Sequence, residues 1–181
     1  MKGKSSLAAV TAVGNDRTGI VAAVTRVLFE EGCNLEDATS TILSGHFSMM
    51  LVVTLPEGAT SQQVEKRLAA VASDFDLVIT VRDVYEAHLE AVEATHVISV
   101  YGGDRPGIVY RVAEHLSAAG VNITDLSSRV IGSEASRVYA LMLEVAAGPE
   151  VTSAILEDDL AELKQELGVD ISVNEIESDI L

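Results

Sequence analysis

Apolar residues follow two different spacings in the first part of the chain. A run from Leu7 to Val13, bounded by Gly14-Asn15, predicts a buried strand. From Ile20 to Leu28 apolar residues recur every three or four positions, which predicts a helix with one buried stripe. Gly32 is the kind of residue that commonly ends a helix. The chain therefore opens with a strand, a loop and a helix.

The next segments predict a hairpin, a second helix and a final strand. Leu35 to Leu43 and Phe47 to Leu55 are extended segments joined by a tight turn at Ser44-Gly45. Pro56-Glu57-Gly58 closes the hairpin. Helical spacing then returns at Val64, Leu68, Val71 and Ala72, and the run Leu77 to Val81 is rich in branched residues typical of strands. The predicted order is βαββαβ.

This pattern occurs twice at a constant offset of 88 positions. A constant offset leaves no room for insertions, so the loop, the helix and the next turn are expected to share one geometry. The first set is Gly14, Asp16, Arg17, Gly19, Ile20, Val21, Val24, Leu28, Gly32, Asn34 and Asp37, and the second is Gly102, Asp104, Arg105, Gly107, Ile108, Val109, Val112, Leu116, Gly120, Asn122 and Asp125. The elements predicted in the second half are His96 to Tyr101, a helix from Pro106 to Ala119, Val121 to Ile131, Ser136 to Ala146, a helix from about Pro149 to Leu167, and Val169 to Val173.

The repeated order predicts an α+β protein with two ferredoxin-like domains, residues 1–90 and 91–181. In each, a split βαβ pair forms an antiparallel sheet of order 4-1-3-2 with both helices on one face. Residues 84–93 contain no Gly or Pro, so we expect an ordered connection between the domains. Units of this size gain stability from packing on a twin, so we expect the halves to dock.

The net charge of the chain argues against some classes of binding partner. The formal net charge is −16, and residues 91–181 hold 16 of the 28 acidic residues but only 5 of the 12 lysines and arginines. Direct nucleic-acid binding needs clustered basic residues and aromatic platforms, which this sequence lacks. No apolar run approaches the roughly 18 residues of a membrane span and no leader-like segment opens the chain, so we expect a cytoplasmic protein. Cys33 is the single cysteine, which excludes an internal disulfide.

The strand–loop–helix–turn signature resembles that of the ACT domain family. The matching segments are Gly14-Asn15-Asp16-Arg17-Thr18-Gly19-Ile20-Val21 with Gly32-Cys33-Asn34-Leu35, and Asp104-Arg105-Pro106-Gly107-Ile108-Val109 with Gly120-Val121-Asn122-Ile123. The chain is similar to stand-alone ACT-domain pairs over nearly its whole length. This resemblance implies a non-catalytic regulator that senses a small amino acid, such as glycine or serine, and acts on transcription or metabolism through a protein partner such as a transcriptional activator. It implies no cofactor.

The loop signature also suggests where a ligand binds. Gly19 and Gly107 stand where a strand gives way to a helix N-terminus, whose unpaired amides and dipole favour a carboxylate. Side-chain oxygens of Asn34 and Asn122 are acceptors for an ammonium group. The resemblance implies a ligand held between the loop and that Asn across a pair of domains, which the two repeats would form internally. The expected ligand-binding residues are Asn15, Asp16, Gly19, Ile20, Asn34, Gly103, Asp104, Gly107, Ile108 and Asn122.

Purely structural roles remain open for the same loops. The serine-sensing ACT domain has Asn where this chain has Asp16 and Asp104, and His where it has Gly14 and Gly102. An ionised Asp accepts from an ammonium but donates nothing to a carboxylate, so the ligand would sit differently or not bind. On the structural interpretation Asp16 and Asp104 cap the following helices, while Asn34 and Asn122 hold left-handed or turn conformations. The protein would then be an interaction module with empty pockets.

Other chemistry is less well supported by the sequence. An enzyme of the acylphosphatase type would hold phosphate with Arg17 or Arg105, yet each follows an Asp that opposes a phosphate. His46, His88, His96 and His115 lack the spacing of metal ligands, and Cys33 fits a small core residue better than a thiol sensor. A sheet with helices on only one face leaves an apolar face to cover, so we expect a homodimer.

Overall fold

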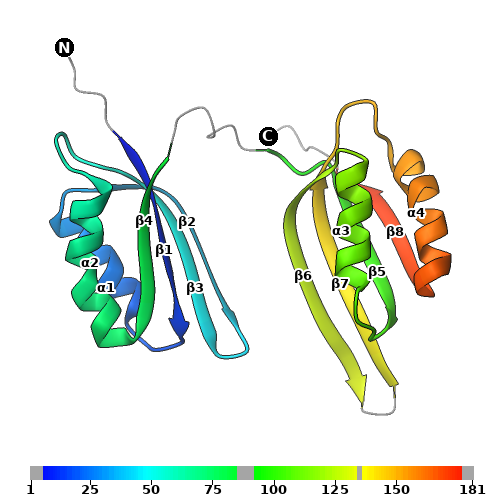
Figure 1. The fold of residues 1–181 in the computed structure, drawn as a ribbon, viewed down its shortest axis with the longest axis horizontal. Coiled ribbons are helices and arrows are strands. Elements are labelled where there is room, and N and C mark those ends of the chain that lie inside the picture. Colours follow the sequence, from blue (N-terminus) through cyan, green and yellow to red (C-terminus); the bar gives the residue numbers. More distant parts are fainter. Residues whose placement is uncertain (1–5, 85–91, 134–135, 177–181) are drawn as a thin grey trace. The chain divides into compact units, whose positions relative to one another are not determined.

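A computed structural model describes residues 6–84, 92–133 and 136–176. The chain divides into two compact units, Met1–Glu90 and Ala91–Leu181, each with its own sheet and helices (Figure 1). The connection predicted over residues 84–93 falls largely on residues outside the described ranges. Each unit is therefore considered by itself.

The predicted βαββαβ order is confirmed in both units. The first contains β1 (Leu7–Asn15), α1 (Ile20–Glu30), β2 (Asn34–Leu43), β3 (His46–Thr54), α2 (Ser61–Phe75) and β4 (Leu77–Val84). The second contains β5 (His96–Gly103), α3 (Ile108–Ala118), β6 (Asn122–Ser133), β7 (Ser136–Ala146), α4 (Ser153–Leu167) and β8 (Val169–Glu175).

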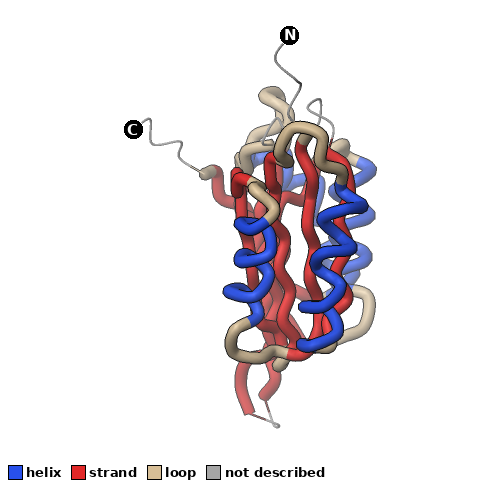
Figure 2. The backbone as a smooth tube through the Cα atoms, turned by 90° about the vertical axis from the view of Figure 1, so that its left-hand side faces the viewer, coloured by secondary structure: helices blue, strands red, loops and turns tan. Residues whose placement is uncertain are grey.

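Both sheets are antiparallel and have the predicted strand order. The first runs β2-β3-β1-β4 and the second β6-β7-β5-β8, so the first and third strands of each repeat are central. The two helices of each unit lie on the same side of their sheet (Figures 1 and 2). The predicted fold class, two ferredoxin-like units with helices on one face, is confirmed.

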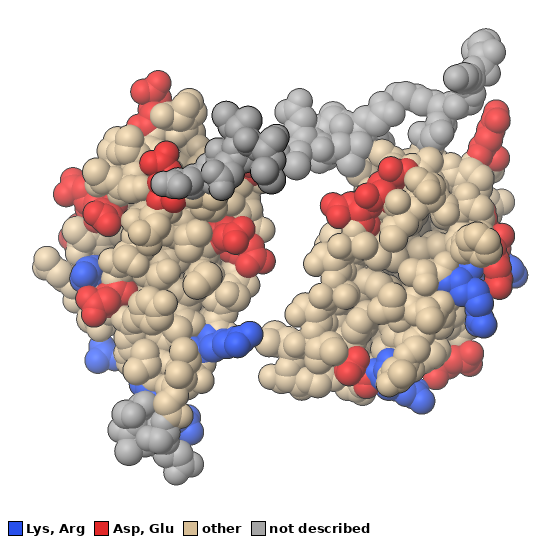
Figure 3. Space-filling model, turned by 180° about the vertical axis from the view of Figure 1, so that it is seen from behind, with Lys and Arg blue, Asp and Glu red and all other residues tan. Residues whose placement is uncertain are grey.

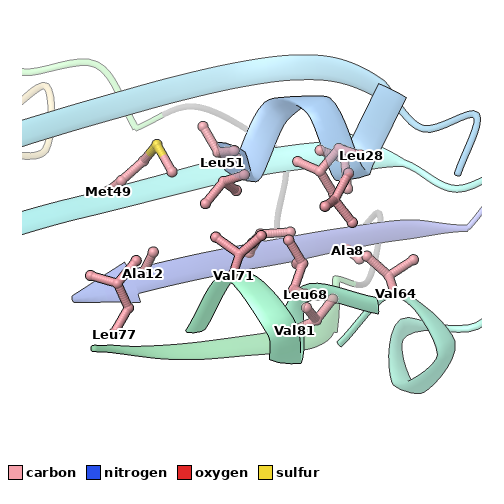
Figure 4. Close-up of a cluster of buried hydrophobic side chains, with 14 of the residues drawn as sticks. Ala8, Ala12, Leu28, Met49, Leu51, Val64, Leu68, Val71, Leu77 and Val81 are labelled. Carbon is pink, nitrogen blue, oxygen red and sulfur yellow. The ribbon is translucent and has the colours of Figure 1, made fainter. Parts of the chain in front are cut away.

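One face of each sheet packs against the helices and forms the core. In β1 every second residue, Ala8, Val10 and Ala12, is fully buried. These residues pack in one core with buried side chains of both helices, including Leu28 of α1 and Leu68 of α2 (Figure 4). The other sheet face stays uncovered within each unit, and Val13, Met50 and Val78 are exposed on it. The alternation in β1 is the period expected of a strand buried on one side.

Two helices of the second unit begin later than the sequence predicts. The helix expected from Pro106 starts at Ile108, because Gly107 adopts a left-handed φ of 97° and serves as the N-cap. The helix expected from Pro149 starts at Ser153, because the Thr152 hydroxyl accepts a hydrogen bond from the Ile155 amide at 3.4 Å. A threonine N-cap thus sets the start of α4.

Each repeat contains the same irregularity in its second strand. The register of β2 against β3 shifts between Leu35 and Asp37, and that of β6 against β7 shifts between Ile123 and Asp125. The extra residues, Glu36 and Thr124, are 88 positions apart. The duplication has therefore kept a β-bulge in place.

The surface agrees with the acidic composition. Acidic side chains are spread over the visible face of both units, and basic ones are fewer (Figure 3). Among the described residues, no helix has the length and apolar character needed to cross a membrane.

Candidate ligand site in the first unit

The loop between β1 and α1 is fastened on two sides. The Asp16 amide donates to the carbonyl oxygen of Gly45 at 2.9 Å, which ties the loop to the β2–β3 turn. Arg17 Nη1 donates to the Asp74 carbonyl at 3.2 Å, and its guanidinium lies 5.7 Å from the centre of the Phe75 ring. The loop is thus held by the hairpin on one side and by the end of α2 on the other.

The helix that follows the loop begins without a capping side chain. Gly19 is the N-cap of α1 with a left-handed φ of 100°, and no side chain caps this helix end. The first turn also contains no acidic residue. In the second unit Gly107 repeats this geometry before Ile108. The interpretation that Asp16 and Asp104 cap these helices is therefore wrong. In α1 the Ile20 amide donates to the Arg17 carbonyl at 3.4 Å, which leaves the Val21 and Ala22 amides to a ligand.

An open pocket of about 830 Å³ lies beside this helix end. It brings together three of the residues expected from the sequence, Asp16, Gly19 and Ile20. The opposite wall comes from the end of the β2–β3 hairpin, through Ser40, Ile42 and Phe47, which the sequence did not suggest. Ile42 pairs with Phe47 in the hairpin. In the sequence these two residues flank the predicted turn, which is the feature that could have suggested them as pocket residues. The structure adds the hydrogen bond from the Asp16 amide to the Gly45 carbonyl, which places that turn beside the loop.

The other loop residues expected from the sequence lie at the ends of strands or at a helix start in their own units. Asn15 ends β1 opposite His46. Gly103 ends β5 opposite Val138, and Asp104 follows it in the loop that leads to Gly107. Ile108 opens α3 and is buried in the core of the second unit.

Asn34 lies far from the loop of its own unit. It pairs with Thr54 at the start of β2, whereas the loop contacts the turn that follows the end of that strand. A strand rises about 3.3 Å per residue, so the ten residues of β2 separate the two places by roughly 30 Å. One small amino acid cannot contact both the loop and Asn34 of the same unit.

Asn34 instead belongs to a polar cluster at the β-bulge. Its Nδ2 donates to the Glu36 carboxylate at 2.8 Å, and the Thr54 hydroxyl donates to the same oxygen at 2.6 Å. Donation from Thr54, and then from Asn34, lowers the pKa of Glu36 below its ordinary value. This cluster was not predicted from the sequence, because the bulge that aligns its members comes from strand pairing.

The second unit lacks this cluster. Asn122 pairs with Ala146, whereas Asn34 pairs with Thr54, and Thr124 occupies the bulge position that Glu36 has in the first unit. The carboxylate and the threonine hydroxyl of the cluster are therefore both missing. Asn34 and Asn122 both lie in strands, and the left-handed residues before them are Gly32 and Gly120. The interpretation that the asparagines hold left-handed conformations is therefore wrong.

Both loop arginines turn toward the end of the second helix in their unit. Arg17 contacts Asp74 and Phe75 at the end of α2. Arg105 Nη1 lies 3.7 Å from the position that a Cβ would take on Gly168, the C-cap of α4. The negative end of a helix dipole favours such cations. This orientation weakens the phosphate-binding interpretation of these residues.

The other candidate side chains are dispersed. His46 is in β3 and His115 in α3, His96 is buried with its Nδ1 2.8 Å from the Thr95 hydroxyl, and His88 lies outside the described residues. Over residues 6–84, 92–133 and 136–176, no three His, Cys, Asp or Glu side chains form a group that could hold a metal ion. Burial, and then the Glu31 carboxylate, raises the pKa of the Cys33 thiol, which disfavours the reactive thiolate.

Comparison with known families identifies both units. The family model described as ACT domain matches residues 6–82 and 94–174. The chain belongs to the ACT domain family. Each match covers the strands and helices of one unit, so the protein is a tandem of two ACT domains.

Relatives match either most of the chain or about one ACT domain of it. The chain is 27% identical over 167 residues to the glycine cleavage system transcriptional repressor of Escherichia coli, covering 91% of this chain and 87% of the relative. It is 39% identical over 75 residues to a UPF0237 protein of Streptococcus mutans, which covers 41% of this chain and 85% of that protein. The latter match corresponds in length to one ACT domain.

Solved structures extend the similarity to the whole fold. A crystal structure of an unknown protein from Galdieria sulphuraria has a TM-score of 0.78 at 25% identity, covering 96% of this chain and 99% of that chain. A structure described as a glycine cleavage system transcriptional repressor has a TM-score of 0.74 at 20% identity, covering 95% and 98%. The fold of the two units is thus shared with these solved structures over nearly the whole chain.

Proposed function

We propose that this tandem ACT protein is a non-catalytic regulator that binds a small amino acid, glycine or serine, in the pocket beside α1 and passes the signal to a protein partner. The observation that carries the proposal is the pairing of opposite polarities in one pocket. Asp16 supplies a carboxylate, and the uncapped start of α1 at Gly19 supplies amide donors.

An α-amino acid carries the complementary charges on neighbouring atoms. Its ammonium group is a donor that suits the Asp16 carboxylate, and its carboxylate suits the N-terminal amides and positive dipole end of α1. Ile42 and the buried Phe47 line the opposite wall with apolar surface. A ligand with little or no side chain leaves these walls unstrained, which favours glycine or serine.

The first unit also offers a surface for a protein partner. Five apolar side chains of α1 and β2 are exposed, and Phe29 is 82% exposed. The set is Val21, Phe29, Leu35, Ile42 and Leu43. Val21 and Ile42 also line the pocket. A ligand that reorders these two side chains would change the affinity of the surface for a partner, which is a coupling free energy between two sites.

The similarity to the glycine cleavage system transcriptional repressor supports an effect on transcription. The net charge of −16 disfavours contact with DNA by this chain itself. We therefore place the contact with DNA on a partner, such as a transcriptional activator, whose activity this protein would restrain or release.

Isothermal titration calorimetry with glycine and serine tests the proposal. Saturable heat is expected from the intact chain. Asp16→Ala removes the acceptor for the ammonium group and should weaken binding at least about tenfold, the usual effect of losing a hydrogen bond between charged groups. Asp104→Ala removes the matching carboxylate of the second ACT domain and should leave this binding unchanged.

Other outcomes decide against the proposal. No heat from any amino acid, with the fold intact by circular dichroism, would leave an interaction module whose loops are structural. Equal binding by the intact chain and Asp16→Ala would place the ligand elsewhere.

A further inference from the structure

The uncovered face of the second sheet contains a hollow that the proposed function does not use. It measures about 290 Å³ and its lining includes Tyr101, Ser127, Arg129, Ile131, Ala140 and Met142. These residues come from β5, β6 and β7, the three adjoining strands of that sheet (Figure 1).

Strand register explains why a hollow forms there. Arg129 pairs with Ala140, and Ala140 pairs with Tyr101, so the three residues form one row across the sheet. Ala140 precedes the buried Leu141 and therefore stands on the opposite, uncovered face. Adjacent strands are about 4.8 Å apart, which separates the backbones at Arg129 and Tyr101 by roughly 10 Å. The short side chain of Ala140 forms the floor of the hollow, between the long side chains of Arg129 and Tyr101.

The rows on either side close the hollow further. Ser127 and Met142 are paired two residues away on one side, and Ile131 and Val138 are paired two residues away on the other. Met142 is 46% exposed and Tyr101 is 44% exposed, so both present apolar surface to the opening. The walls thus combine an aromatic ring, a thioether, a hydroxyl and a guanidinium.

The first unit provides an internal comparison. The corresponding row there is Thr41, Ser48 and Val13, in which no side chain is long. The first unit therefore has neither the guanidinium nor the aromatic wall in this row. The two long side chains that wall the hollow are thus particular to the second ACT domain.

The charges around the hollow select for an anion. Arg129 makes no ion pair with any residue that the structure describes. Asp170, which continues the row beyond Tyr101, is bound to Lys164 at 3.2 Å. The lining residues include no carboxylate to receive an ammonium group. An amino acid is therefore a poor fit, whereas a carboxylate without an ammonium group is a good one.

We propose that this hollow binds a small aromatic carboxylate, with its carboxylate on Arg129 and its ring between Tyr101 and Met142. Guanidinium groups recognise carboxylates through paired hydrogen bonds, and both ring edges and sulfur atoms pack favourably against aromatic ligands. This site is independent of the amino-acid pocket in the first unit.

Phenylacetate is the probe, and phenylacetamide is its uncharged counterpart. Titration of each into the ¹⁵N-labelled full chain is followed by backbone amide shifts. Phenylacetate should produce saturable shifts confined to residues 101, 127–131 and 140–142, and phenylacetamide should bind at least about tenfold more weakly. Arg129→Gln should weaken phenylacetate binding by a similar factor, because it removes the charge-assisted contact.

Two further variants separate the hollow from the general charge of the hairpin. Ala140→Leu fills the floor and should abolish binding. Arg137→Gln removes the other arginine of the same hairpin, at a position that alternates onto the opposite face, and should leave binding unchanged. Absence of saturable shifts, equal binding by Arg129→Gln, or equal binding of phenylacetamide would overturn the proposal.

Discussion

The guanidinium of Arg17 lies 5.7 Å from the centre of the Phe75 ring while its Nη1 donates to the carbonyl oxygen of Asp74. These contacts join the loop before α1 to the last turn of α2. The loop is the rim of the amino-acid pocket, so its shape depends on a helix that begins more than forty residues later in the chain.

Replacing Arg17 should loosen this loop without unfolding the domain. An exposed cation–π contact contributes about 0.5–1 kcal/mol. Arg17→Ala is therefore expected to speed hydrogen exchange of the Asp16 amide roughly two- to fivefold. Arg26→Ala, on the exposed side of α1, is the control and should leave that exchange rate unchanged. An unchanged rate in Arg17→Ala would show that the contact does not hold the loop.

Glycine at the ends of β1 and β5 should be required for close packing. A Cβ on Gly102 would lie 2.6 Å from Cγ1 of the buried Val169, and a Cβ on Gly14 would lie 2.7 Å from the Asp76 carbonyl oxygen. Gly102→Ala is expected to lower the free energy of unfolding by about 1–3 kcal/mol. Urea unfolding measures this change.

The neighbouring glycine supplies the control for that variant. A Cβ on Gly103 would have 3.9 Å to its nearest atom, in Arg105, so Gly103→Ala should have little effect. Equal destabilisation by the two variants would contradict the packing account. The same crowding at Gly14 and Gly102 leaves no room for the His that the serine-sensing ACT domain has there.

The Glu36 cluster predicts a pH dependence. Hydrogen bonds from Thr54 and Asn34 lower the pKa of Glu36 in the folded state. The stabilisation is therefore present above the ordinary value of 4.5 and is lost as the pH falls through the lowered one. Thr54→Val should raise the pKa of Glu36 toward 4.5, as measured by carboxyl ¹³C NMR.

A threonine of β2, the strand that contains Glu36, is the control for this titration. Thr39 pairs with Met50 and makes no bond to Glu36, so Thr39→Val should leave the pKa of Glu36 unchanged. If Thr54→Val also leaves it unchanged, the hydrogen bond is not the cause of the lowered pKa.

Sequence patterns predicted the fold well, because both repeats carry strong periodic signals. The alternate burial of Ala8, Val10 and Ala12 and the helical stripe through Val24 and Leu28 match the apolar spacing of the chain. The bulge at Glu36 gave no such signal. Every residue of β2 is exposed, so no alternation of buried and exposed positions marks its register.

Only the part of the candidate site that is local in sequence could be predicted. Asp16, Gly19 and Ile20 are adjacent in sequence, and the physics of helix ends predicts their role locally. Ile42 and Phe47 reach the same pocket only through the pairing of two strands, and Arg17 is oriented by Phe75 from another helix. Contacts between distant segments determined what a single sequence did not reveal.

We expect the chain to associate as a homodimer. Phe29 is 82% exposed, and β2 is an edge strand of the first sheet, and each of these features favours burial against a second copy. Light scattering above micromolar concentration should give twice the chain mass of 19.1 kDa. Phe29→Ser is expected to shift the mass toward a single chain, and a single-chain mass for the unaltered protein would contradict the expectation.

The proposed function depends above all on binding of a small amino acid at the start of α1 in the first ACT domain. The most direct test is a glycine titration of the ¹⁵N-labelled full chain, with the Asp104→Ala variant in parallel. We expect saturable shifts of the amides of Asp16 and Gly19 to Ala22 in both proteins, because these groups surround the pocket. Shifts that avoid this loop, or that vanish in Asp104→Ala, would contradict it.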